Sequence, residues 1–402
     1  MKFFQLDPME NRVFGLDFVR FLAIFIVLFN HSLILVPQHI TPYMRFLMFD
    51  GVDIFFVLSG YLIGGILLKI LTKDQPTFPL LLHFWKRRWL RTYPAYIILL
   101  LLLSIYTLIL RPTHFPDDWY KYPFFLQNLI SEKNMFFGES WSLSVEEWFY
   151  LTIPTLLFIA LFLFKNKLKI TSLMVCSAVI LGIIYYRFVV FNRFGHIDIK
   201  DVDAVKHLKT MVETNLKYQV LPRLDSIMFG VLGAWVALFF PKIWTWKHNY
   251  LFALLAIIPL YLGFENSRSI TDTYTAVWDP AVKSLTVLLI LPFFSTLKTV
   301  PGKIAKGITF LSLISYSMYL LNLTVVSQIF IKNTLHGNLE GRTISSLTPK
   351  ELIYNDFTKY WPGKHIIGEF WYIDLALFWI LTIGLGFVLY KLVEVPFMKM
   401  RK

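Results

Sequence analysis

Long apolar runs dominate this chain and restrict it to a membrane environment. Most runs reach about 18 residues or more, the length that a helix needs to cross roughly 30 Å of hydrocarbon. Hydrophobic residues make up 56% of the 402 residues and charged residues 16%, whereas a soluble domain averages about 25% charged residues. Lipid offers the backbone no hydrogen bonds, so helices are the expected spanning form. We therefore expect an all-α, polytopic transmembrane helix bundle.

We expect about ten spans, with boundaries accurate to a few residues. They cover residues 14–36, 46–68, 93–110, 147–164, 170–190, 224–240, 249–263, 280–297, 308–331 and 371–393. Lys and Arg cluster in alternate short loops, at residues 69–91, 165–169 and 298–306, and in the final KMRK. Because cytoplasmic loops carry this excess of basic residues, both termini are expected in the cytoplasm. The long outward loops are then 111–146, 191–223 and 332–370.

The net charge of +13 does not indicate nucleic-acid binding, because the basic residues follow the topology of the loops. Residues 14–36 are too long for the apolar part of a signal peptide and lack a small-residue cleavage site, so they are expected to be a retained span. Cys176 is the only cysteine and permits neither an internal disulfide nor a cysteine metal site. We expect one integral-membrane domain over 1–402, without an appended soluble domain, bound cofactor or metal.

Three polar groups interrupt the first span. Arg20 and His31 are eleven residues apart, so on a helix they differ by about 20° around the axis and roughly 16 Å along it. Asp17 lies three residues before Arg20 on nearly the same face. A buried Asp17–Arg20 ion pair and a hydrogen-bonded histidine would explain this stripe structurally. Charges inside a membrane are costly, however, and therefore indicate function by default.

Two further segments carry polar groups at span ends. The second span opens GVDIFFVLSGYLIGG, where Asp53 is either a loop-edge residue or part of an outer site, and the small residues allow close helix packing. Arg87, Arg88 and Arg91 precede the third span. Arginine forks bind phosphate oxygens bidentately, although basic residues at a cytoplasmic helix end are also what topology requires.

The later spans add acids, a second arginine and an amide. Glu146 and Glu147 lie at the entrance of the fourth span, where they suit either helix capping or binding of a polar group. Arg223 and Asp225 open the sixth span, as an anchor and a cap or as site residues. Asn322 lies deep in the ninth span and needs a hydrogen-bond partner there.

Taken together, the segments resemble the acyltransferase-3 family of bacterial integral-membrane O-acyltransferases. The resemblance follows the family's order along the chain, through NRVFGLDFVRFLAIFIVLFNH, GVDIFFVLSGYLI, RRWLRTYPAY, SWSLSVEEWFYL, PRLDSIMFG, ISYSMYLL and VEVP. It implies transfer of an acyl group, usually acetyl, from cytoplasmic acyl-CoA to a hydroxyl of a glycan or another extracytoplasmic acceptor. It also implies a multi-pass protein of the bacterial inner membrane that takes part in O-acetylation and polysaccharide modification.

The resemblance also implies roles for individual residues. His31 matches the family's essential first-span histidine, Arg20 its first-span arginine, and Glu146 the first acid of its S-V-E-E motif. Arg88 and Arg91 match the paired arginines that handle the donor, with Arg87 beside them. Asn322 departs from the histidine that many members carry there, which puts more weight on His31.

These interpretations lead to one expected catalytic mechanism and to two alternative functions. His31 is expected to take the acceptor's proton as general base, or to carry the acyl group itself, while Arg20 stabilises the thioester oxygen. Asp17, Asp53, Glu147, Arg223, Asp225 and Asn322 are expected on the acceptor side or in structural roles. A proton-coupled transporter would also place Asp, Arg and His in the membrane, but the sequence has no evident internal repeat. A non-catalytic scaffold would leave the charged stripe unexplained.

Overall fold

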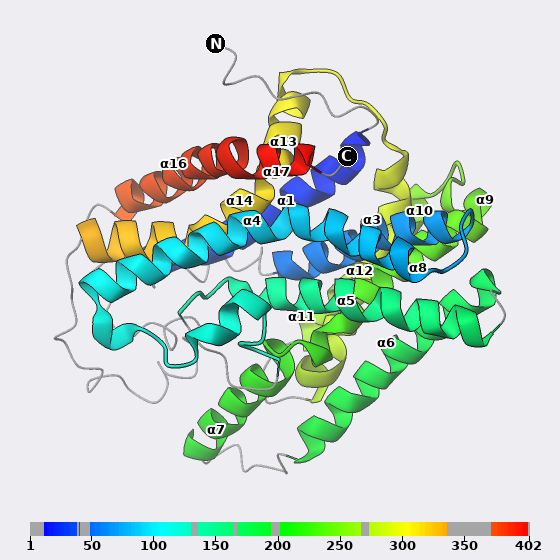
Figure 1. Ribbon diagram of the computed structural model, residues 1–402, viewed down its shortest axis with the longest axis horizontal. Helices are drawn as coiled ribbons and strands as arrows, with labels where there is room; N and C mark the ends of the chain where they lie inside the picture. Colours follow the sequence, from blue (N-terminus) through cyan, green and yellow to red (C-terminus); the bar gives the residue numbers. More distant parts are fainter. Residues whose placement is uncertain are drawn as a thin grey trace.

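The computed structural model describes residues 12–37, 40, 49–129, 136–164, 167–193, 202–266, 273–335 and 371–400. All regular elements within these ranges are helices. The long ones are α1 (Phe14–Ser32), α3 (Gly51–Leu71), α4 (Phe78–Leu110), α5 (Ser140–Leu163), α6 (Leu168–Arg193), α8 (Leu224–Phe239), α12 (Asp279–Thr296) and α16 (Trp371–Leu389). Figure 1 shows most of them running along one common direction, as expected for a membrane bundle.

Shorter helices connect or extend these elements. They are η2 (Leu33–Leu35), η4 (Pro112–His114), η5 (Trp119–Phe124), α7 (Val202–Val212), η6 (Glu213–Lys217), η7 (Leu221–Arg223), α9 (Pro241–Trp244), α10 (Tyr250–Leu255), α11 (Ile257–Asn266), η8 (Tyr274–Trp278), α13 (Lys303–Leu313), α14 (Ser315–Leu321), η9 (Asn322–Leu335), η11 (Tyr390–Glu394) and α17 (Val395–Lys399). Of the predicted outward loops, 111–146 holds η4, η5 and the start of α5, and 191–223 holds α7, η6 and η7. Residues 336–370 of the third lie outside the described residues.

Eight helices in the described part of the chain are long and apolar enough to cross a membrane. A ninth span results if α13 and the following α14–η9 segment, which are bent by 55° relative to each other, count as one. The remaining predicted span, 249–263, falls on a shorter apolar stretch, Tyr250–Gly263. The all-α, polytopic fold is therefore confirmed, while the number of ten spans and the cytoplasmic termini stay predictions.

Two helices begin well before the spans predicted within them. The third span was expected from residue 93, but α4 begins at Phe78 and continues through Pro94. Its first half packs on α5, where the Trp85 indole donates to the carbonyl of Tyr150 at 2.9 Å. This contact holds the helix beyond the apolar stretch. The fourth span was expected from residue 147, but α5 begins at Ser140, so Glu146 and Glu147 lie inside the helix and do not cap it.

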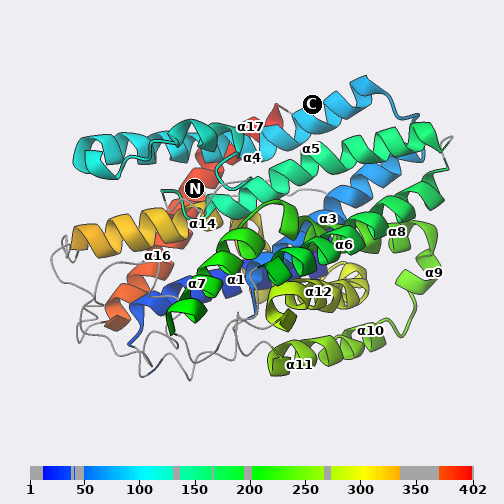
Figure 2. The same cartoon turned by 90° about the horizontal axis from the view of Figure 1, so that it is seen from below.

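The centre of the bundle is built on α1 and α3. Helix α3 packs most extensively along α8, and α1 packs against α3, α12 and α13. In Figure 2, α4 and α5 cover one side of this centre, and α10, α11 and α12 cover the other. Gly60 and Gly230 form a close crossing of α3 and α8, because a Cβ on Gly60 would lie 1.9 Å from the carbonyl oxygen of Ile227. Small residues thus permit close helix packing, as expected for this span.

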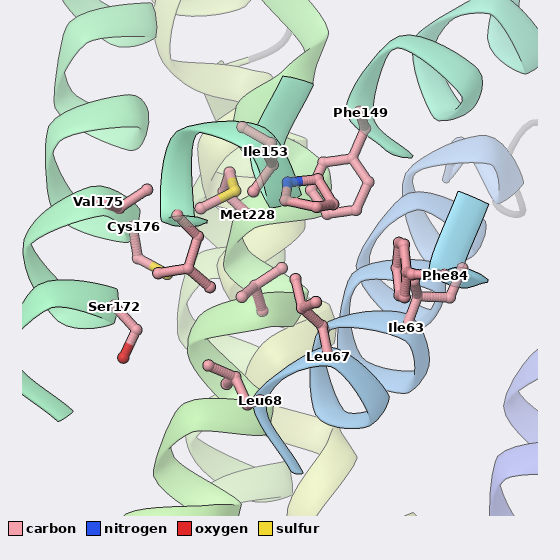
Figure 3. Close-up of a pocket in the computed structure, with 14 residues that line it drawn as sticks. Ile63, Leu67, Leu68, Phe84, Phe149, Ile153, Ser172, Val175, Cys176 and Met228 are labelled. Atoms are coloured by element: carbon pink, nitrogen blue, oxygen red, sulfur yellow. The ribbon is translucent and has the colours of Figure 1, made fainter. Parts of the chain in front are cut away.

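A small apolar cavity lies among α3, α4, α5, α6 and α8 (Figure 3). Its lining includes Ile63, Phe84, Ile153, Cys176 and Met228. The cavity measures about 20 Å³, which is room for roughly one water molecule. It is too small for an acyl donor and carries no charged group, so the polar interior between α1, α4, α5 and η9 is the better candidate for chemistry.

Candidate active site

Two of the three polar groups of α1, Asp17 and His31, meet the broken helix formed by α13, α14 and η9. Near the start of α1, Asp17 accepts a hydrogen bond from the Ser312 hydroxyl at 3.1 Å. Near its end, His31 Nδ1 lies 2.5 Å from Asn322 Oδ1. The helical count therefore correctly predicted that these groups share a face turned toward protein. The sequence did not indicate which helix receives them.

Asp17 pairs mainly with a different arginine from the one expected. Arg12 Nε donates to Asp17 Oδ2 at 2.8 Å, and Arg12 Nη2 forms an ion pair with Oδ1. Arg20 Nη1 is 3.9 Å from the same carboxylate. The expected Asp17–Arg20 pair is thus only a loose contact, because Arg12 occupies the carboxylate. Asp17 serves to hold the start of α1 against α13, and Arg20 is left to interact with other charges.

The orientation of Asn322 determines which ring nitrogen of His31 carries the proton. The Asn322 Nδ2 group donates to the carbonyl of Tyr319 at 2.6 Å and to that of Met318 at 3.4 Å. Its Oδ1 therefore faces His31 and can only accept, so the hydrogen sits on Nδ1 of the imidazole. In this tautomer the basic lone pair is on Nε2, the form that general-base or nucleophilic chemistry requires.

Arg20, Arg91 and Glu146 form a charged cluster near α1. Arg20 interacts electrostatically with Arg91 and Glu146, and Glu146 interacts with both arginines. The Glu146 carboxylate accepts hydrogen bonds from the hydroxyls of Ser59 and Tyr150, each at 2.9 Å. The hydrogen bond from Ser59 joins Glu146 of α5 to α3, and Arg20 of α1 and Arg91 of α4 lie close enough to influence its charge electrostatically. The carboxylate is held by neutral hydroxyl groups, and no described arginine lies within ion-pair distance of it.

Arg88 and Glu147 form the adjoining part of the site. Arg88 is 8% exposed and lies over the ring of Phe84 at 5.8 Å. Glu147 accepts from the Thr92 hydroxyl at 2.6 Å and interacts electrostatically with Arg88. Within the described residues, Arg88 Nε and Glu147 Oε2 are buried without a hydrogen-bond partner. Buried polar atoms of this kind are costly unless they meet a ligand.

The three arginines expected at the donor site separate into two groups. Arg88 is buried and Arg91 is half-buried, whereas Arg87 is exposed. Arg88 and Arg91 are three residues apart on α4, a spacing that places them on one side of the helix. Arg87 lies on the outer side of the helix, where basic residues follow from topology alone.

Asp53 and Arg223 are buried partners. Their side chains form an ion pair between α3 and the end of η7, and the residues are 1% and 4% exposed. The guanidinium of Arg223 also lies 5.6 Å from the ring centre of Phe56. Two of the alternatives considered for them, a loop-edge Asp53 and a flanking Arg223, are thereby excluded. The pair fixes α3 against the start of α8.

Asp225 does not cap α8, although that alternative was open. It receives two parallel hydrogen bonds from Arg187 of α6, at 2.9 and 2.7 Å, and both side chains are fully buried. Arg187 also donates to the carbonyls of Val277 and Pro222. These bonds join α6, η7, η8 and α8 at one point. This geometry identifies Asp225 as a structural residue.

Sequence reasoning missed Arg187 and Glu139. Arg187 lies near the end of an apolar run, and its charge was a usable signal. Glu139 precedes α5 and is 1% exposed. Its carboxylate accepts from the backbone N–H groups of Leu323 and Thr324, at 2.8 and 2.7 Å. Burial raises the pKa of Glu139 to about 7, while these hydrogen bonds act in the opposite direction.

The candidate site therefore has two parts: a histidine of defined tautomer at the end of α1, and a group of arginines that begins with Arg20, roughly 16 Å back along the helix. His31 offers Nε2 as a base or nucleophile. Arg20, Arg88 and Arg91 offer positive charge for an anionic donor. Such an arrangement suits acyl transfer to a hydroxyl group.

Comparison with known proteins adds independent evidence. A sequence model of the acyltransferase domain family matches residues 13–349. The O-acetyltransferase OatA of Staphylococcus aureus (strain NCTC 8325) is 35% identical over 148 residues, which are 34% of this chain and 24% of OatA. A second protein of that species (strain COL), provisionally named an O-acetyltransferase, is 27% identical over 336 residues, 78% of this chain and 50% of its own length.

The chain thus spans between about a quarter and a half of the length of these curated relatives. No solved structure matches it. The family match nevertheless covers most of the chain, including α1, the arginines of α4, and Glu146. The chain belongs to the acyltransferase-3 family.

Proposed function

We propose that this protein is a membrane O-acyltransferase that moves an acetyl group from acetyl-CoA to a hydroxyl of a glycan on the opposite side of the membrane. The observation that carries the proposal is the 2.5 Å contact between His31 Nδ1 and Asn322 Oδ1. It holds a histidine inside the membrane with Nε2 as the basic nitrogen. Membership of the acyltransferase-3 family supports the reaction type.

Donor binding is assigned to the arginines of α4. Acyl-CoA carries phosphates, and buried guanidinium groups bind phosphate oxygens through charge-assisted hydrogen bonds. Arg88 has a buried Nε without a described partner, and Arg91 lies on the same side of α4. Arg87 is exposed and supports the approach of the donor by its charge alone. The excess of Lys and Arg in the short loops supports a donor site on the cytoplasmic side.

The chemical step runs through His31. Nε2 takes the proton of the acceptor hydroxyl while its oxygen attacks the thioester carbonyl. The carbon–sulfur bond then breaks, the coenzyme A thiolate leaves, and the imidazolium returns the proton to it. The products are an acetyl ester and free coenzyme A. In the alternative route, Nε2 attacks the thioester first and the acyl group passes from histidine to the hydroxyl.

Arg20 and Glu146 are assigned to the donor. Arg20 lies roughly 16 Å along α1 from His31, so its guanidinium is assigned to the path of the acyl-CoA arm and not to the thioester oxygen at His31. Glu146 interacts with the charges of both Arg20 and Arg91. Held by Ser59 and Tyr150, its carboxylate offsets part of their positive charge. The acceptor reaches His31 from the side of Asp53 and Arg223. The proposed location is the cytoplasmic membrane of a bacterium, the inner membrane where two membranes are present.

Membrane vesicles supplied with radiolabelled acetyl-CoA test this function. Vesicles that contain the protein are expected to accumulate label in alkali-labile esters of extracted glycans or lipids. His31→Ala is expected to reduce this rate about 10²–10⁴-fold, the usual contribution of a general base. His83→Ala, an exposed histidine on α4, serves as the matched control and is expected to retain the rate. Equal labelling by His31→Ala and the unmodified protein would refute the proposal.

Donor binding is tested by comparing Arg88→Ala with Arg87→Ala. Loss of a buried charge-assisted bond costs about 1.5–3 kcal/mol, so Arg88→Ala is expected to raise the Kd for acetyl-CoA roughly 10- to 150-fold. Arg87 is exposed, so its replacement is expected to have a much smaller effect. Equal effects would assign both residues to topology.

The same vesicles distinguish an acyltransferase from the alternative, a proton-coupled transporter. A proton-coupled transporter would move a solute without releasing coenzyme A, and its broken helices would line the path. Although α13 and α14 are bent at such a break, the family relationship favours the enzyme. Release of one equivalent of coenzyme A in the absence of acceptor would identify the acyl-histidine route, and no such burst would identify the direct route.

A further inference from the structure

The junction between α14 and η9 lies directly beside His31. At Asn322 the helix changes from α-helical to the wider π-helical hydrogen bonding. Such local π segments occur frequently at functional sites. Asn322, the residue that holds Nδ1 of His31, is the first residue of the widened part. Whatever fixes this junction also fixes the position of the Asn322 amide.

The first turn of α5 holds the junction on both sides of Asn322. After it, the Glu139 carboxylate accepts from the N–H groups of Leu323 and Thr324, at 2.8 and 2.7 Å, and from the Thr324 hydroxyl. Before it, the Tyr319 hydroxyl bonds to Ser142 Oγ at 2.6 Å and donates to the Glu139 carbonyl at 3.2 Å. The side chain of Asn322 in turn donates to the carbonyl of Tyr319.

Burial of a carboxylate at this position carries a free-energy cost. Glu139 is 1% exposed, and no described cation forms an ion pair with it. Burial of an acid in such surroundings is unfavourable unless hydrogen bonds compensate. The compensating donors are the backbone N–H groups that follow Asn322. The cost of burying Glu139 is therefore offset only while the backbone at this junction keeps its geometry.

We infer that Glu139 is a positioning residue: through the backbone of Leu323 and Thr324 it holds Asn322 in place, and Asn322 sets the orientation of His31. Ser142 contributes from the other side through Tyr319. This inference rests on the proposed function, because it concerns the rate of the step at His31. Glu139 itself touches neither donor nor acceptor.

Four variants test the inference in the purified protein. Glu139→Ala removes the carboxylate, and Glu139→Gln keeps an acceptor for the two N–H groups. Ser142→Ala removes the bond to Tyr319. Ser144→Ala is the matched control, since Ser144 is also buried on α5 but bonds to Gln127 and the carbonyl of Ser140. The fraction of folded protein is measured by the protection of Cys176, the only cysteine, from thiol labelling.

The readout is kcat per folded molecule, the KM for acetyl-CoA and the pH profile of acetyl ester formation. Misplacement of a reacting group by about 1 Å costs up to 10²-fold in rate. Glu139→Ala is expected to lower kcat roughly 10- to 100-fold with an altered pH profile and an unchanged KM. Glu139→Gln is expected to retain kcat within about threefold, Ser142→Ala to lie between the two, and Ser144→Ala to match the unmodified protein.

The experiment distinguishes failure of the proposed function from failure of the inference about Glu139. If ester formation does not depend on His31, the proposed function is refuted and the inference falls with it. If His31 is required but Glu139→Ala retains kcat and the pH profile per folded molecule, the inference alone is refuted and Glu139 only anchors the helices. If Glu139→Ala does not fold, Ser142→Ala decides: a kcat equal to that of Ser144→Ala overturns the inference.

Discussion

The crossing of α3 and α8 allows a sharp test of how packing supports the site. A Cβ on Gly60 would lie 1.9 Å from the carbonyl oxygen of Ile227, whereas a Cβ on Gly65 would lie 3.6 Å from Ala234 Cβ. The first distance is about 1.5 Å short of ordinary contact, and the obstacle is backbone that cannot rotate away. The second is an ordinary contact. Gly60→Ala and Gly65→Ala are thus the same substitution on one helix, but only Gly60→Ala creates a clash with the backbone of α8.

The expected difference follows from two opposing effects. Alanine is favoured over glycine in a helix interior by about 1 kcal/mol at either position. Overpacking costs about 1–3 kcal/mol or more, and applies only at Gly60. We therefore expect Gly60→Ala to be less stable than Gly65→Ala by about 3 kcal/mol, the upper end of this range.

A functional consequence accompanies the loss of stability. Ser59 is the neighbour of Gly60, and its hydroxyl donates to Glu146 at 2.9 Å. A helix displacement of about 1.5 Å, the amount by which the Gly60 contact falls short, breaks this bond, because hydrogen bonds weaken steeply beyond about 3.2 Å. Gly60→Ala is thus expected to lower the rate of acetyl transfer per folded molecule, and Gly65→Ala is not.

The free energy of unfolding is measured in mixed micelles with increasing denaturing detergent. Labelling of Cys176 reports unfolding, since this residue is 2% exposed in the folded protein. Free energies of unfolding that agree within about 0.5 kcal/mol for the two variants would mean that the helices separate without cost. The reasoning from the close crossing would then be refuted.

Three further predictions concern single contacts. Asn322→Ala removes the hydrogen bond to Nδ1 of His31, a loss of about 1–3 kcal/mol that is expected to lower kcat roughly 5- to 150-fold. Asn249→Ala is the control: Asn249 is a buried asparagine bonded to the carbonyl of Pro292, and its replacement is expected to lower stability alone. Arg187→Met leaves Asp225 buried and unpaired and is expected to cost about 3–5 kcal/mol of unfolding free energy. The double variant Arg187→Met/Asp225→Asn is expected to restore part of that loss. Equal losses in the two variants would contradict the role of Arg187 as the partner of Asp225. Burial raises the pKa of Glu139 to about 7 from an ordinary 4.5. The protonated form therefore stabilises the fold fully below about pH 4.5, and this stabilisation, about 3 kcal/mol at most, is lost as the pH rises through 7. Glu139→Gln is expected to flatten that part of the curve of unfolding free energy against pH, and an unchanged slope would contradict the assignment.

Hydropathy and residue spacing were sufficient to predict the class of fold and to select most residues of the candidate site. Long apolar runs allow only helices in a bilayer, and the cost of intramembrane charge made Asp17, Arg20 and His31 recognisable. Helical periodicity also predicted that the three share one face and that Arg88 and Arg91 point the same way. These properties are local, so they can be calculated from spacing alone.

Only the tertiary structure decided which partner each group has. Arg12 replaces Arg20 beside Asp17, Arg187 holds Asp225, and Asn322 meets His31 across 291 residues of chain. Such pairings depend on which helices pack together, and hydropathy carries no information on this. Glu139 illustrates the limit most clearly. By sequence it is one more polar residue before a span, and only the fold brings its carboxylate to the backbone beside Asn322.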